Sequence, residues 1–306
     1  MAASPEKPKP SSLVPYFMLM AHGTILGALF SANKIAIEGG IPFLGYAFWQ
    51  SLGAGAILLV VSLVVGNPLQ LSMAHLRTYI VTGVGGIAVP FSVYAYLAPK
   101  LPAGVITLVL TLIPPLTYLF AYALGLERFR WLCIAGILFG VAGVSLVVVP
   151  ETSLPSPDMA KWVLVALLAP LSAAVTNVFA QRFRPPRTSS LTLACGLLLG
   201  SAVVLFPIMM ATGSLYLFPD PPSPGDWALF AVVLINAVMF ILFFEIIRLA
   251  GAVFFSQVNY VGVLDGILWA MVVFGERHSA WIWIALVLLF IGLTLVNAGT
   301  RKSAGS

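Results

Sequence analysis

Charged residues are scarce in this chain. Only 8% of its 306 residues are Asp, Glu, Lys or Arg, whereas 60% are hydrophobic and the mean hydropathy is +1.05. A soluble globular domain carries about 25% charged residues. The 15 basic and 10 acidic side chains cannot keep a surface of this size wetted, so lipid must be the solvent for most of it. This scarcity argues against a soluble enzyme.

Other absences narrow the function further. The two cysteines, Cys133 and Cys195, have neither disulfide nor metal-ligand spacing, so we expect no metal site. No Gly-x-x-x-x-Gly-Lys-Ser/Thr loop is present, so no nucleotide-driven step and no cofactor is expected. The net charge of +5 is scattered singly or in short groups, which argues against a nucleic-acid partner. Residues 1–12 are polar and Pro-rich, and the apolar segment after them is too long for the core of a signal peptide.

Long apolar runs are what the sequence has. About 20 apolar residues cross a bilayer as a helix. Breaking the chain at polar, Pro-rich and Gly-rich points predicts ten spans, of which the eighth and ninth nearly touch at Arg248–Gly251. The spans are 13–36, 43–65, 78–98, 102–124, 131–149, 161–180, 191–211, 227–248, 251–274 and 279–298.

The basic residues predict the orientation. With the N-terminus in the cytoplasm, eleven Lys and Arg fall on the inner side and four on the outer side. An even number of spans then places both termini, 1–12 and 299–306, in the cytoplasm. The linker 150–160 between the fifth and sixth spans is expected outside.

An internal repeat divides the chain. An offset of 149 residues aligns 88–147 with 237–296 without a gap, at twelve identities in 60 positions. The informative match is Glu127-Arg128 with Glu276-Arg277, because charges are rare here. We therefore predict two five-helix repeats, 13–149 and 161–298. An odd number of spans inverts the second repeat, and inverted repeats are a recurring plan among secondary transporters.

These features resemble the EamA-type drug/metabolite transporter superfamily. The resemblance is carried by ten spans in two halves, by Gly-Leu-Glu-Arg at 125–128 and Gly-Glu-Arg at 275–277, and by Gly143 and Gly292 near the end of the next span. Ser31-Ala32-Asn33-Lys34 in the first span also fits. The resemblance implies an exporter of small metabolites or toxic cations. Many members carry an Arg in the second span, where this chain has Phe48-Trp49-Gln50, so any ion pair made there is in question.

Ionisable residues inside the spans are functional candidates, because a charge near the bilayer centre costs at least about 2.5 kcal/mol. Asp265 lies just past the middle of the ninth span, where it could exchange protons, bind a substrate amine or be structural. His22, in the first span, is a second candidate for proton coupling. Lys34 is expected to reach the interface or to pair with Glu38, one turn away.

Polar and aromatic residues predict a central cavity bounded by spans 1, 3, 4, 6, 8 and 9. Prolines support it, because a carbonyl freed by proline is tolerated in a membrane only beside protein or a water-filled cavity. The candidate substrate-binding residues are Asn33, Tyr94, Thr107, Thr111, Thr176, Asn177, Phe240, Ser256, Gln257, Tyr260 and Asp265.

The sequence therefore predicts an all-α membrane protein with ten transmembrane helices in two inverted five-helix repeats. We expect a bacterial inner-membrane exporter of small neutral metabolites, amino acids above all, working by alternating access. A multidrug exporter of lipophilic cations is the alternative; a membrane-embedded lipid-modifying enzyme would need a cluster of His and acids, and the three His are far apart. As partners we expect the substrate and the lipid bilayer, and no nucleic acid. Gly136-x-x-x-Gly140 fits either packing within a monomer or a weak dimer.

Overall fold

The computed structural model describes residues 13–148, 159–277 and 279–301. The predicted tail 1–12, most of the linker 150–160 and the end of the tail 299–306 lie outside these ranges. Over the described residues the chain is helical and contains no strand, which confirms the all-α prediction.

The predicted apolar runs form helices close to their expected bounds. Seven of the described segments are long and apolar enough to cross a membrane, and three shorter apolar helices cover Leu110–Ala123, Trp131–Gly143 and Ala280–Gly292. The uninterrupted helices are α1 (Val14–Glu38), α2 (Phe43–Val64), α7 (Trp131–Val148), α10 (Ser190–Ala211), α11 (Pro224–Ala250) and α14 (Ala280–Arg301).

Four further segments are interrupted within their length. They are α3 (Met73–Gly83), the π-helical turn η1 (Val84–Ala88) and α4 (Val89–Leu97); α5 (Ala103–Val109), the 3-10 turn η2 (Leu110–Leu112) and α6 (Ile113–Ala123); α8 (Ala160–Ala166) and α9 (Leu168–Arg182); and α12 (Ala252–Ser256) and α13 (Val258–Phe274).

Prolines explain three of these interruptions. A proline has no amide hydrogen and its ring displaces the carbonyl four residues earlier. Pro90 follows η1, Pro114 follows η2, and Pro170 follows the break at Leu167. The fourth break, at Gln257, has no proline. Irregular backbone within a membrane is tolerated where it is buried in protein or lines a cavity.

Gly251 makes the sharp turn between α11 and α12. Its φ of +87° lies in the region that favours glycine, and α11 ends there at Ala250. The structure therefore contains the break predicted at Arg248–Gly251.

Close helix contacts are made at glycines. A Cβ on Gly27 of α1 would lie 2.5 Å from the Cβ of Asp265 on α13, and a Cβ on Gly83 of α3 would lie 2.5 Å from the carbonyl oxygen of Leu197 on α10. Without a lipid-driven hydrophobic force, membrane helices associate through such small-residue contacts. The Gly136–Gly140 side of α7 packs against α14 of the same chain, so this stripe serves packing within the monomer.

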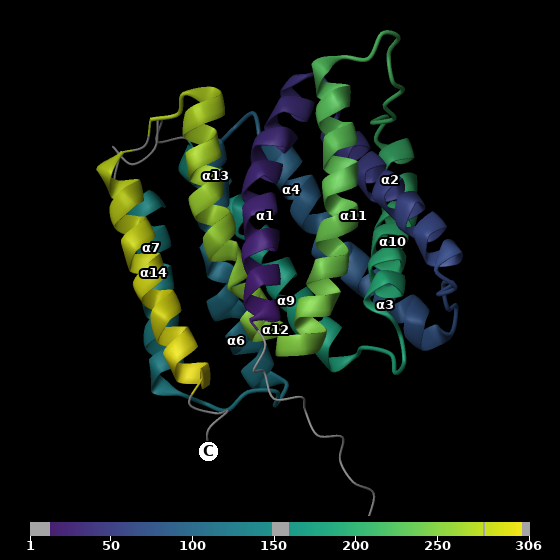
Figure 1. Cartoon of the computed structure of the whole chain (residues 1–306). Coiled ribbons are helices and arrows are strands. Elements are labelled where there is room, and N and C mark those ends of the chain that lie inside the picture. Colours follow the sequence, from purple (N-terminus) through teal and green to yellow (C-terminus); the bar gives the residue numbers. More distant parts are fainter. Residues whose placement is uncertain (1–12, 149–158, 278, 302–306) are drawn as a thin grey trace, which may run out of the picture.

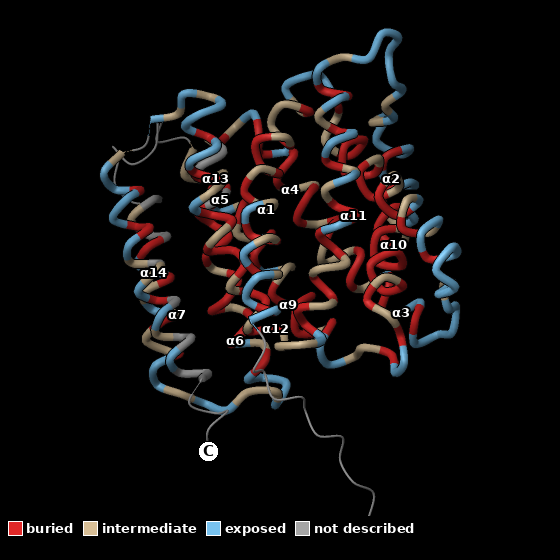
Figure 2. The backbone as a smooth tube through the Cα atoms, in the orientation of Figure 1, coloured by how far each residue is buried: buried red, intermediate tan, exposed pale blue. Residues whose placement is uncertain are grey.

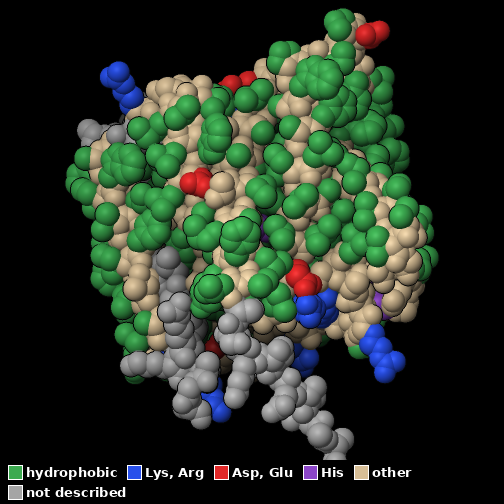
Figure 3. Space-filling model, viewed as in Figure 1, with side chains coloured by type: hydrophobic (Ala, Val, Ile, Leu, Met, Phe, Trp, Pro, Cys, Tyr) green, Lys and Arg blue, Asp and Glu red, His purple; other side chains and the backbone are tan. Residues whose placement is uncertain are grey.

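The helices form one bundle. In Figure 1, α7 and α14 stand together at one side, α2, α3 and α10 at the other, and α1, α11 and α13 between them. Buried residues gather toward the interior and exposed ones toward the periphery (Figure 2). Hydrophobic side chains cover most of the face shown in Figure 3, with Lys and Arg mainly near the end where α1 begins and α14 ends.

A buried amide pair links α2 to α11. Asn236 Nδ2 donates to Gln50 Oε1 at 2.7 Å, and both residues are almost fully buried. A neutral hydrogen bond therefore occupies this part of the second span, where the resemblance implied an Arg and an ion pair.

Candidate functional site

A cavity of about 90 Å³ lies in the middle of the bundle. It is bounded by all six of the predicted spans and also by α10. All four interrupted segments line it, and three of them do so at or beside the interruption, through Gly86 of η1, Leu110 of η2 and Val258 at the start of α13. The other lining residues are His22, Leu26, Phe30, Pro90, Phe91, Tyr94, Ile113, Ala173, Thr176, Asn177, Leu197, Met239, Phe240, Phe243, Phe255 and Asn259.

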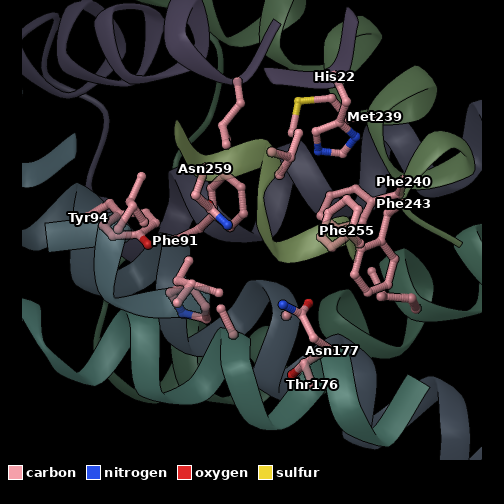
Figure 4. Close-up of a pocket in the computed structure, with 18 of the residues that line it drawn as sticks. His22, Phe91, Tyr94, Thr176, Asn177, Met239, Phe240, Phe243, Phe255 and Asn259 are labelled. Carbon is pink, nitrogen blue, oxygen red and sulfur yellow. The ribbon is translucent and has the colours of Figure 1, made fainter. Parts of the chain in front are cut away.

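Six aromatic rings of Phe and Tyr make up much of this wall. Figure 4 labels five of them in two groups, with Phe91 and Tyr94 on one side and Phe240, Phe243 and Phe255 on the other. The ring centroids of Phe243 and Phe255 are 4.8 Å apart at an interplanar angle of 85°, an edge-to-face arrangement. The cavity therefore offers flat apolar and π-electron surfaces to an occupant.

A few uncharged polar groups interrupt the aromatic wall. Asn177 Nδ2 donates a long hydrogen bond of 3.4 Å to Thr117 Oγ1, and Asn259 Nδ2 donates to the carbonyl oxygen of Ser256 at 2.7 Å. His22 Nδ1 and Thr176 Oγ1 are buried without a hydrogen-bond partner among the described residues. Buried polar atoms are normally paired, so unpaired atoms on a cavity wall point to a ligand or water.

The cavity carries no formal charge. No Asp, Glu, Lys or Arg is among the described residues that line it. A neutral wall cannot offset the two negative charges of a phosphate ester. The site therefore fits an occupant that is neutral overall.

Five of the predicted site residues line this cavity: His22, Tyr94, Thr176, Asn177 and Phe240. They come from α1, α4, α9 and α11, which shows that these four elements face a common space. Their role in binding stays a prediction.

Other predicted site residues are not among the described residues that line the cavity. The hydroxyls of Thr111 and Ser256 donate to carbonyl oxygens three residues earlier, Leu108 and Val253. Gln257 is half-buried and is not part of the wall. The ring of Tyr260 packs 5.7 Å from that of Phe290, and the side chain of Thr107 lies outside the described residues.

Asp265 is half-buried at the contact between α1 and α13, opposite Gly27. It does not line the central cavity. Asp265 is therefore not placed to contact an occupant of the central cavity directly. Its predicted part in proton coupling remains a prediction.

Several lining residues were not among the predicted ones. Phe243 lies one turn after Phe240 on α11, and Phe255 lies one turn before Asn259 across the break at Gln257. Phe243 is three residues from Phe240 and Phe255 is four residues from Asn259, a spacing that places side chains on the same face of a helix. This spacing was the signal in the sequence that could have identified them.

Lys34 pairs with a residue far away in the sequence. Its Nζ lies 3.0 Å from Glu276 Oε1 and 4.3 Å from the centroid of the Phe274 ring. The expected pairing with Glu38 is therefore wrong. The ion pair joins the ends of α1 and α13, and Glu276 belongs to the Glu-Arg pair of the predicted repeat.

At the opposite end of the bundle a second polar cluster joins α9, α10 and α11. Arg184, in the turn after α9, donates to the carbonyl oxygen of Phe244 at 3.1 Å and to Ser190 Oγ at 3.1 Å. Ser190 donates to Glu245 Oε2 at 2.6 Å, and Glu245 also pairs with Arg248. Burial and the nearby Arg248 lower the pKa of Arg184 from its usual value, whereas Glu245 opposes that shift.

Several helices long and apolar enough to cross a membrane, packed around an uncharged cavity, are the features of a polytopic membrane protein. The chain belongs to the EamA-like transporter family, which matches residues 13–149 and again residues 160–298. The expected relationship is thereby confirmed. A solved structure titled only "Crystal structure of protein" has a TM-score of 0.65 and 20% sequence identity, over 96% of this chain and 99% of that one, so the fold is shared. No curated protein matches the chain.

Proposed function

We propose that the chain is a secondary transporter that exports small neutral metabolites, amino acids above all, across the inner membrane of a bacterium. The observation that carries this proposal is the uncharged, aromatic-lined cavity enclosed by helices from both family-matched segments. A water needs roughly 10–15 Å³ of such volume, so a cavity of about 90 Å³ has room for about six to nine waters. A metabolite of similar size fits it.

Alternating access between two inverted five-helix repeats is the mechanism we propose. It is supported by interruptions at related places, because the 149-residue offset aligns Gln257 with Leu108, just before the 3-10 turn η2. Paired broken helices beside a central site are typical of inverted-repeat transporters. The basic residues near the end where α1 begins support a cytoplasmic location for both termini (Figure 3).

Amino acids suit the cavity because their two charges cancel. Their polar ends need hydrogen-bond partners, which Asn177, Asn259, Thr176 and His22 can supply, and their side chains need apolar surface. A phosphate ester would need convergent basic residues, which the described wall does not contain.

A lipophilic cation is the second candidate. The six aromatic rings favour it, since a cation over a ring face gains about 0.5–2 kcal/mol. The described residues of the wall include no carboxylate, which weakens the case. A membrane-embedded enzyme finds less support: no group of three His, Cys, Asp or Glu suited to a metal occurs in the described ranges.

Counterflow in proteoliposomes tests the proposal. Purified protein is given L-leucine, tetraphenylphosphonium and glucose 6-phosphate in turn, and we expect accumulation of labelled leucine only. The matched control is Gly86→Leu, which projects a side chain from η1 into the cavity and should abolish uptake while the protein remains monodisperse in detergent. Transport of tetraphenylphosphonium without leucine would replace the proposal by its alternative, and transport of neither would contradict it.

A further inference from the structure

A second, smaller chamber adjoins the central cavity toward the end of α1. It measures about 10 Å³, room for about one water. Its wall is made by Phe30, Asn33, Lys34, Tyr94, Ala98 and Ile106. Phe30 and Tyr94 line both spaces, and their rings meet edge-to-face with centroids 5.3 Å apart. This ring pair is therefore the partition between the cavity and the chamber.

The carboxamide of Asn33 is the poorly satisfied polar group at this chamber. Asn33 is 3% exposed, and neither its Nδ2 nor its Oδ1 has a hydrogen-bond partner among the described residues. Lys34, beside it, has a side chain only 15% exposed and an ammonium group held by Glu276. An amide donor and an ammonium group that converge on one small space form a recognition site for a carboxylate.

We propose that this chamber is an outer subsite that binds the carboxylate of the substrate, which replaces Glu276 as the partner of Lys34. The proposal rests on the proposed transport of amino acids and extends it. One carboxylate replaces another, so Lys34 is never left as an unpaired buried charge, the most costly state for such a group.

The exchange would also break a connection between two helices at this end of the bundle. The Lys34–Glu276 ion pair joins the end of α1 to the segment just after α13. When the substrate takes Lys34, the ion pair that ties α1 to this segment is lost. Substrate that passes the Phe30–Tyr94 partition thereby breaks the ion pair that closes this end of the bundle. In a carrier without substrate the ion pair stays intact and this end stays closed.

Two substitutions distinguish a subsite that binds the substrate from an ion pair that only holds the two helices together. Lys34→Gln and Glu276→Gln break the same ion pair, but only the first removes the group that would bind the substrate. Transport in proteoliposomes is measured for L-leucine and for L-leucinamide, which lacks the carboxylate. For the native protein we expect a preference for leucine of about tenfold or more, as one charge-assisted hydrogen bond provides. Lys34→Gln should remove the preference, whereas Glu276→Gln should keep it and lower the KM for leucine.

Lys100→Gln is the matched control. Lys100 lies just beyond the end of α4, but its ammonium group packs on the rings of Tyr96 and Trp162 and does not line the chamber. This variant should retain the native preference. Leucine transport with equal effects of Lys34→Gln and Glu276→Gln would overturn the subsite alone. A native protein that carries neither compound would contradict amino-acid transport and the subsite with it.

Discussion

Replacement of Asn177 by leucine is the sharpest test of the central cavity. The residue is 4% exposed, and its carboxamide points into the space between the two aromatic groups (Figure 4). Leucine has a similar volume and no polar group. The one described hydrogen bond that it loses, to Thr117, is 3.4 Å long. A bond at that length contributes less than the typical ~1 kcal/mol, so the fold should survive.

The effect on substrate should be much larger. A hydrogen bond to a charged substrate group contributes about 1.5–3 kcal/mol, which corresponds to an increase in KM of roughly 10- to 150-fold. Initial rates of leucine counterflow measure it, with the melting temperature in detergent as a check on folding. The matched control is the double variant Gln50→Leu, Asn236→Leu, which removes an equally buried amide pair away from the cavity. An unchanged KM in Asn177→Leu, or the same rise in the control, would refute the assignment of this wall to the substrate.

Three further predictions concern packing, cavity size and coupling. Gly83→Ala should lower the melting temperature, because overpacking of a tight contact costs about 1–3 kcal/mol; Gly140→Ala, where the added Cβ meets neighbours at ordinary distances, should not. Phe240→Ala should enlarge the cavity and shift selectivity from leucine toward tryptophan in competition assays, and unchanged selectivity would argue against contact between this ring and the substrate. Asp265→Asn should abolish the response of transport to a pH gradient while insertion stays normal; an intact response would leave Asp265 a structural role only.

Helix positions were predictable from sequence because lipid imposes a simple rule. Every backbone group must be satisfied within the helix, so apolar runs of sufficient length become helices. The bounds of α2 and α7 agree with the predicted spans to within one residue. Charge is informative for the same reason: it is so costly in lipid that the few charged positions report topology and repeats.

The direction in which each side chain points around its helix axis was harder to predict. These helices are apolar on nearly every side, so their sequences contain little information about rotation around the axis. The hydroxyls of Thr111 and Ser256 illustrate the difficulty, because each bonds to a carbonyl of its own helix and needs no polar cavity. Tyr94 and Asn177 occur in equally apolar surroundings and do reach the cavity.

Contacts between residues far apart in the chain could not be predicted from the sequence either. Glu38 lies one turn from Lys34 and was the natural partner, yet Glu276 is 242 residues away and forms the ion pair. Which of two acids reaches a lysine depends on how closely α1 and α13 approach. Glycines in the sequence show that a close approach is possible, but they do not show which two helices make it. In the same way, the amide of Asn236 could not be assigned to Gln50 until both helices were placed.

Accessibility of one cavity position from both sides of the membrane tests alternating access most directly. Ala173 lines the cavity from α9, and the native Cys133 and Cys195 are fully buried, so the native protein should resist thiol reagents. We predict that Ala173→Cys is labelled by a membrane-impermeant maleimide in both right-side-out and inside-out vesicles, and that leucine changes the two rates in opposite directions. Labelling from one side only, with and without leucine, would contradict the account.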